Sequence, residues 1–184
     1  MGLAKTGWKR INHIMIKKGI LIIFFAGLIT SCEDEKTISS YNPVDWEARG
    51  VENSVTDSLK KGTSYLSVYS EIYSQTEHRT HNLTSTVSMR NVDINDTIYI
   101  DKAEYFNTEG KPIRIYFDHP IYIAPLETVE IVVDETDIAG GTGANFIFEW
   151  STNEYSPEPL FEGVMISTSG QQGLSFTSKG VRIK

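Results

Sequence analysis

The chain has 184 residues, a formal charge of −7 and one cysteine. A single cysteine excludes an internal disulfide, so the fold depends on its hydrophobic core. The first 31 residues hold five of the 17 basic residues and no acid, which leaves 12 basic against 24 acidic residues in the rest of the chain. This acidic balance argues against nucleic-acid binding, which relies on contacts between basic side chains and phosphates. It also argues against attachment to anionic lipid headgroups through charge.

An apolar run over residues 20–29 follows the basic pair Lys17 and Lys18 and ends close to the cysteine. The run is shorter than the about 20 residues that a membrane-spanning helix needs. Ile-Thr-Ser-Cys at residues 29–32 resembles the lipobox of bacterial lipoproteins. We therefore predict that residues 1–31 are a lipoprotein signal peptide and that Cys32 carries the lipid.

Two features flank this signal. Residues 1–14 make a long leader, and Met15 begins a compact one, so Met15 is a second candidate start of translation beside Met1. The acids at residues 33–35 have two interpretations, a surface-sorting signal of the kind found in one group of Gram-negative bacteria or ordinary linker charge. The expected location is the cell envelope, with the lipid in the outer membrane and the domain on its periplasmic or surface face.

Residues 32–62 show no apolar period and contain many Ser and Thr residues, so we predict a lipidated N-terminus and a disordered tether. Trp46 is the exception, and we expect it to pack on the folded domain over residues 63–184.

Short runs rich in β-branched and aromatic residues fill that domain, and no convincing helix follows residue 62. The expected strands fall at residues 65–69, 83–90, 98–105, 112–117, 121–123, 129–133, 146–150, 164–166, 174–176 and 181–183. This pattern predicts an all-β fold, an immunoglobulin-like β-sandwich of about seven to nine strands.

Three local signals refine the expectation. The apolar phase of the strand at 98–105 slips by one residue, which predicts a β-bulge near Asp101 and Lys102. Residues 107–111 form a turn signal in which Gly110 can take a positive φ. The alternation over residues 146–150 is the most apolar in the chain and predicts the centre of the core.

Four segments in order resemble one bacterial family of unknown function, the domain-of-unknown-function family 3124. They are residues 83–91, 105–110, 137–146 and 162–178. The resemblance implies a small exported or lipid-anchored protein. It implies no activity and supplies no catalytic residues.

The glycine-rich stretch at residues 140–145 invites comparison with a phosphate-binding loop, but it lacks the Gly-Lys-Ser/Thr ending and a following helix. A tight connection before a strand is the favoured interpretation. Its backbone amides could still meet a ligand, so the candidate ligand surface consists of Arg90, Gly140, Gly141, Gly143 and Asn145.

Other chemistry has little support. His78 and His81 are three residues apart, which places them on opposite faces of a strand, and zinc sites usually need three or four ligands. No Gly-x-Ser-x-Gly motif occurs, and Cys32 is used for the lipid, so no nucleophile is apparent. We expect no catalytic residue, metal or cofactor. Tyr99, Tyr116 and Tyr122 fall out of phase with their apolar neighbours and are expected on the solvated face.

The sequence thus favours a non-enzymatic envelope lipoprotein, a binding or assembly module that contacts the membrane through its lipid and an envelope protein or a carbohydrate as partner. The alternative is a metal- or carboxylate-dependent hydrolase of the envelope. That alternative requires one pocket in which the glycine-rich stretch, Arg90 and nearby carboxylates meet.

The signal makes a direct prediction. Cys32→Ser removes the sulfur that takes the diacylglycerol, so the variant is expected to leave the membrane fraction of cells. Immunoblotting of membrane and soluble fractions measures this. A Cys32→Ser protein that still fractionates with membranes would contradict lipidation.

Overall fold

The computed structural model describes residues 44–168 and 173–184. The expected signal peptide (1–31), Cys32, the candidate start at Met15 and the acids at 33–35 lie outside the described residues. No helix in the described ranges is long and apolar enough to cross a membrane.

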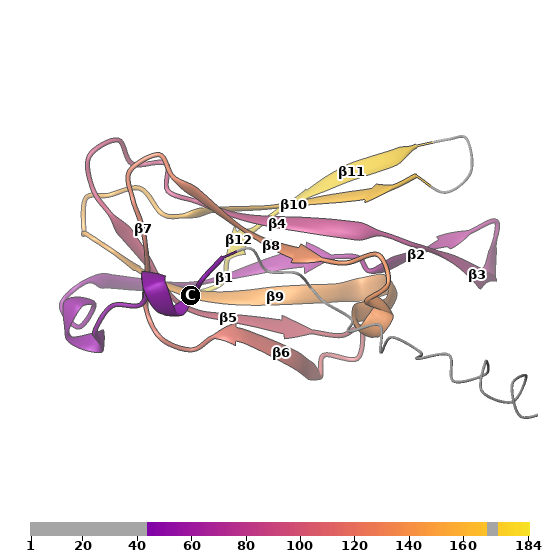
Figure 1. Cartoon of the computed structure of the whole chain (residues 1–184), viewed down its shortest axis with the longest axis horizontal. Helices are drawn as coiled ribbons and strands as arrows, with labels where there is room; N and C mark the ends of the chain where they lie inside the picture. Colours follow the sequence, from indigo (N-terminus) through magenta and orange to yellow (C-terminus); the bar gives the residue numbers. More distant parts are fainter. Residues whose placement is uncertain (1–43, 169–172) are drawn as a thin grey trace, which may run out of the picture. The chain divides into compact units, whose positions relative to one another are not determined.

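Two antiparallel sheets pack face to face, and a two-stranded hairpin extends from them (Figure 1). The strands are β1 (Lys60–Val68), β2 (Glu71–Ser74), β3 (Thr76–Asn82), β4 (Thr84–Arg90), β5 (Ile98–Phe106), β6 (Pro112–Phe117), β7 (Ile121–Ile123), β8 (Thr128–Val133), β9 (Ala144–Thr152), β10 (Leu160–Ser167), β11 (Leu174–Lys179) and β12 (Val181–Arg182). The first sheet has the order β12-β1-β9-β5-β6, with β7 also on β5, and the second has the order β11-β10-β4-β8. The predicted all-β sandwich is confirmed.

The core lies between the sheets and centres on β9, as predicted. Phe146, Phe148 and Trp150 are fully buried. Phe148 stacks on Phe161 of β10 in the other sheet, with ring centroids 4.3 Å apart. The strand predicted at residues 83–90 is present as β4, in which Val87 and other inward residues have no exposed surface.

The two predicted backbone irregularities are present. The pairing of β5 with β9 shifts between Ile100 and Lys102, which is the predicted bulge. Gly110 has a φ of 73° in the turn between β5 and β6. The bulge lets Ile100 and Ala103 both face the core although they are three residues apart.

The hairpin β2–β3 was not predicted from the sequence. β3 is polar and almost entirely exposed, and β2 has only four residues, so no apolar alternation marks the hairpin. Some large apolar side chains lie on the solvent-facing side of their strands. Ile166 and Ile115 are 43% and 50% exposed. Tyr116 packs on Phe146 rather than facing solvent, because β6 is an edge strand whose register against β5 shifts twice.

The predicted tether is too long. Residues 44–59 lie on the domain through two short 3-10 helices, η1 (Glu47–Arg49) and η2 (Asn53–Val55). Trp46 packs on Phe117 at 4.8 Å, as predicted, and the Val51 N–H donates to the Pro120 carbonyl at 2.8 Å. These contacts join residues about 70 positions apart, so no local pattern reveals them.

Gly62 provides a test of the core. A Cβ at this position would lie 2.6 Å from Cε2 of the buried Trp150 indole. Gly62→Ala is therefore expected to lower the free energy of unfolding by about 1–3 kcal/mol, the usual cost of overpacking. Gly173→Ala is the control, because nothing lies within 4 Å of its Cβ. Urea unfolding of both variants measures the difference, and equal stabilities would contradict the packing.

Candidate functional site

A cavity of about 540 Å³ lies on the outer face of the first sheet. Outward side chains of β1, β5 and β9 form its base, and η2 with the adjoining residues forms one wall. It is lined by Asn53, Thr56, Asp57, Lys61, Gly62, Thr63, Asp101, Lys102, Asp118, Pro120, Glu149, Trp150 and Lys184. Volumes of this size are typical of small-ligand sites.

Asp101 is the most unusual group in the cavity. It sits in the bulge of β5, outside the regular pairing with β9. The Ser151 hydroxyl donates to Asp101 Oδ2 at 2.5 Å, and Ser151 is fully buried. The second oxygen, Oδ1, is buried and has no hydrogen-bond partner among the described residues. Burial raises the pKa of Asp101, while the Ser151 hydrogen bond and the charge of Lys61 act in the opposite direction.

Charged groups of both signs surround Asp101. The lining contains Lys61, Lys102 and Lys184 as well as Asp57, Asp118 and Glu149. Lys102 is committed to Glu104 outside the cavity, with Nζ 2.6 Å from Oε2. Carboxylates therefore outnumber uncommitted ammonium groups, so the cavity favours a ligand that donates hydrogen bonds or carries positive charge.

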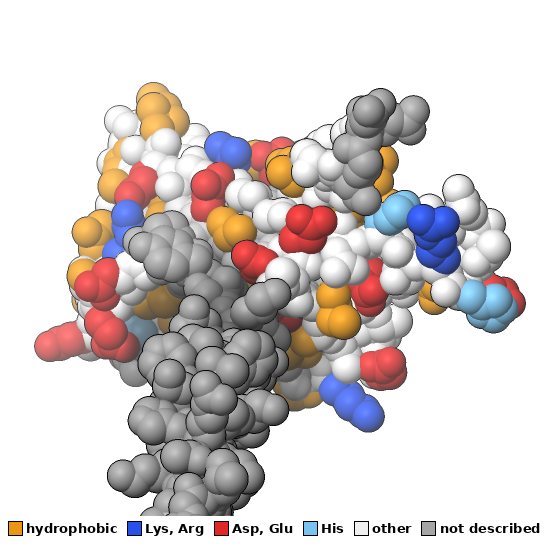
Figure 2. All heavy atoms as spheres, turned by 45° about the vertical axis from the view of Figure 1, so that its right-hand side comes forward, with side chains coloured by type: hydrophobic (Ala, Val, Ile, Leu, Met, Phe, Trp, Pro, Cys, Tyr) orange, Lys and Arg blue, Asp and Glu red, His pale blue; other side chains and the backbone are white. Residues whose placement is uncertain are grey.

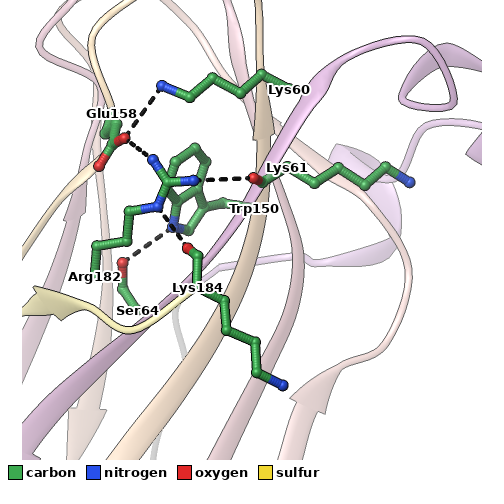
Figure 3. Close-up of polar contacts among 7 residues, drawn as sticks. All are labelled: Lys60, Lys61, Ser64, Trp150, Glu158, Arg182 and Lys184. Atoms are coloured by element: carbon green, nitrogen blue, oxygen red, sulfur yellow. Dashed lines mark hydrogen bonds and ion pairs between the residues drawn. The ribbon is translucent and has the colours of Figure 1, made fainter.

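The end of the chain is fixed beside the cavity by contacts around Trp150 (Figure 3). The Trp150 indole N–H donates to Ser64 Oγ at 3.0 Å, and the Arg182 guanidinium lies over the indole ring, 5.3 Å from its centroid. Arg182 also pairs with Glu158 and donates to the Lys184 carbonyl at 2.5 Å.

Lys61 comes from the same part of β1, but its ammonium group points away from this cluster (Figure 3). Arg182 therefore stabilises the packing around Trp150, and the Lys61 ammonium group remains available to a ligand in the cavity.

The glycine-rich stretch forms a tight connection before β9, η3 (Ile138–Gly143). Gly140 packs so tightly that a Cβ there would clash with the Tyr105 hydroxyl. The Gly141 carbonyl accepts from the Ser70 N–H at 3.1 Å, and the Gly143 N–H donates to Thr108 Oγ1 at 3.0 Å. Asn145, the last residue of the predicted surface, lies half-buried on β9.

Arg90 lies far from this connection. It ends β4 in the second sheet, where it pairs with Glu162 at 3.1 Å and donates to Thr128 at 3.1 Å. The connection lies at the other end of β4, since Ser70 bonds both Gly141 and Leu83. Six residues of strand separate the two ends, about 20 Å. The predicted surface that combined Arg90 with the glycines is therefore not formed.

His78 and His81 lie on β3 of the protruding hairpin, where Figure 2 shows histidine and basic side chains at the right of the view. Over residues 44–168 and 173–184, no group of three or more His, Cys, Asp or Glu residues is placed to hold a metal.

Sequence reasoning found the bulge at Asp101 but did not interpret it as a site. The sequence does place the Asp101 carboxylate where the apolar alternation of the strand shifts by one residue. Because β-bulges often redirect a side chain, that position could have been recognised as a candidate site. Nothing in the sequence connects that residue to Asp57 or Lys184.

The comparisons with known proteins place the chain in one family. The family model described as "Protein of unknown function (DUF3124)" matches residues 61–183. The chain belongs to this family. No curated protein and no solved structure gives a match. The DUF3124 match includes Lys61, Asp101 and Glu149 and begins after η2, so one wall of the cavity lies outside the matched region.

The raised pKa of Asp101 gives a stability prediction with a definite sign. The folded state holds this proton more tightly than the unfolded chain, so the contribution of Asp101 to stability falls as pH rises above about 4. Asp101→Asn keeps an acceptor for Ser151 and cannot ionise. We expect the variant to be more stable than wild type at pH 7, with the difference shrinking as the pH approaches 4.

Glu127→Gln is the matched control, because the hydrogen bond from Arg49 lowers the pKa of Glu127. This variant is expected to be less stable than wild type at pH 7, with a difference that also shrinks in acid. Urea unfolding between pH 4 and 7 measures both effects. A loss of stability in Asp101→Asn at pH 7 would contradict the burial cost.

Proposed function

We propose that the protein is a lipid-anchored component of the cell envelope whose β-sandwich is a non-catalytic binding module. The observation that carries the binding role is the cavity around Asp101, in which a buried carboxylate oxygen lacks a partner among the described residues. A buried polar atom without a hydrogen bond is costly, and a ligand that donates to it removes the cost.

The ligand we propose is polar and presents hydrogen-bond donors. Hydroxyl groups of a carbohydrate or the basic side chain of an envelope protein meet this requirement. Both also suit a lining in which carboxylates outnumber uncommitted ammonium groups.

Binding is favoured over hydrolysis by the arrangement of the side chains. The hydrolase alternative required Arg90 and the glycine-rich connection in one pocket, and they lie at opposite ends of β4. Asp101 itself accepts from Ser151 in the geometry of a fixed structural contact.

The apolar run and residues 29–32 support the anchor. Because the folded domain begins by Val44, only eleven residues, 33–43, separate it from Cys32. A chain of that length spans at most about 40 Å. The proposed module therefore works close to the bilayer.

Photo-crosslinking in intact cells tests the binding role. A photoreactive residue replaces Asn53 at the rim of the cavity, and mass spectrometry identifies the adducts. We expect a defined adduct that is lost when Asp101→Asn is added. Thr177, exposed on β11, is the control position. The same adducts at both positions, or none at Asn53, would refute the proposed site.

A further inference from the structure

Three neighbouring loops at one end of the sandwich expose large apolar side chains. Ile94 is 71% exposed, Leu126 67%, Tyr155 95% and Val92 43%. Hydrogen bonds join the loops, since the Leu126 N–H donates to the Asp93 carbonyl at 3.0 Å and Ser156 Oγ donates to Asp96 at 3.0 Å. Figure 1 shows these loops together at the left, opposite the β2–β3 hairpin. We call Val92, Ile94, Leu126 and Tyr155 the apolar tip.

The tip is held in place by buried polar contacts. Asn91 donates through Nδ2 to the carbonyls of Asp96 and Ile123, at 2.8 and 3.0 Å. The Asp93 carboxylate accepts from the backbone N–H groups of Asn95 and Asp96, at 2.8 and 3.1 Å. These bonds lower the pKa of Asp93. The loop at residues 91–97 is therefore organised to present Val92 and Ile94 outward.

The backbone conformation of Leu126 indicates that the exposure of its side chain has a functional role. The Glu127 N–H donates to the Ala124 carbonyl at 3.0 Å and closes a turn with Pro125 and Leu126 at its centre. Leu126 has a φ of 60°, a conformation that such turns normally give to Gly or Asn. The sequence thus keeps an exposed aliphatic side chain where a smaller residue would be less strained. Strained positions of this kind gather at functional sites.

Several acidic groups around the tip are already engaged. Glu127 pairs with Arg49 at 2.6 Å, and Glu158 pairs with both Lys60 and Arg182. Glu154, next to Tyr155, is exposed, so the tip combines apolar side chains with negative charge. That agrees with the acidic balance of the chain, which disfavours electrostatic attraction to anionic lipids.

The anchored end of the chain enters close to this tip. Val44 begins the folded part, and Arg49, five residues later, contacts Glu127 beside Leu126. Together with the spacer of eleven residues, this places the tip within reach of any bilayer that holds the lipid on Cys32. Aliphatic side chains with a tyrosine are suited to the boundary between headgroups and acyl chains.

We propose that the apolar tip inserts into the surface of the lipid bilayer and gives the domain a second membrane contact. This inference rests on the proposed lipid anchor at Cys32. The contact orients the domain, with the β2–β3 hairpin at the end that points away from the membrane.

Depth-dependent quenching tests the insertion on the full-length lipidated protein. Ile94→Cys is labelled with an environment-sensitive fluorophore, and the protein is reconstituted into phosphatidylcholine vesicles whose acyl chains carry nitroxides. Tyr73→Cys on β2 is the control, since Tyr73 is 61% exposed at the opposite end. We expect quenching and a blue shift at position 94 and neither at position 73.

Leu126→Asn supplies a second variant that spares the fold. Asn tolerates a positive φ, so thermal unfolding is expected to stay unchanged while the quenching at position 94 falls. Unchanged quenching in this variant would overturn the role of the tip.

Flotation of the protein with vesicles distinguishes the lipid anchor at Cys32 from the insertion of the apolar tip. Protein that floats with vesicles through Cys32 but shows no quenching at position 94 overturns the insertion and leaves the anchor intact. Protein that does not float overturns both. A label at position 94 that is shielded in intact cells but unquenched in vesicles indicates a protein partner and also overturns the insertion.

Discussion

A continuous stack of aromatic rings joins the two sheets, and the rest of the structure depends on it. Tyr105 stacks on Phe146, Phe146 on Phe148, and Phe148 on Phe161, with centroids 4.3–5.5 Å apart. The stack crosses from β5 through β9 to β10. In a chain whose one cysteine leaves no partner for an internal disulfide, this apolar contact is what holds the layers together.

The bulge in β5 connects that core to the surface. To bring both Ile100 and Tyr105 inward, the strand must change phase, and Asp101 is the residue left outside the pairing. The same irregularity therefore completes the core and places a carboxylate on the outer face against Ser151. Packing and the candidate site thus have a common origin, and the DUF3124 match includes both.

The N-terminal segment changes how the domain can be used. Because residues 44–59 lie on the first sheet, they form a wall of the cavity and shorten the spacer to the proposed lipid. The Arg49–Glu127 pair brings the segment to the loops that carry Ile94 and Leu126. A short spacer and exposed apolar loops together favour a domain that lies on the bilayer surface.

Sequence by itself determined the strands with clear alternation, the core at residues 146–150, the bulge and the Gly110 turn, since each is a local pattern of period or turn chemistry. The same reasoning reached the proposed anchor at Cys32. Only the tertiary structure decided the polar hairpin β2–β3, the docking of residues 44–59, the separation of Arg90 from the glycines and the apolar tip. Those features arise from contacts between residues distant in the chain, and no local pattern encodes them.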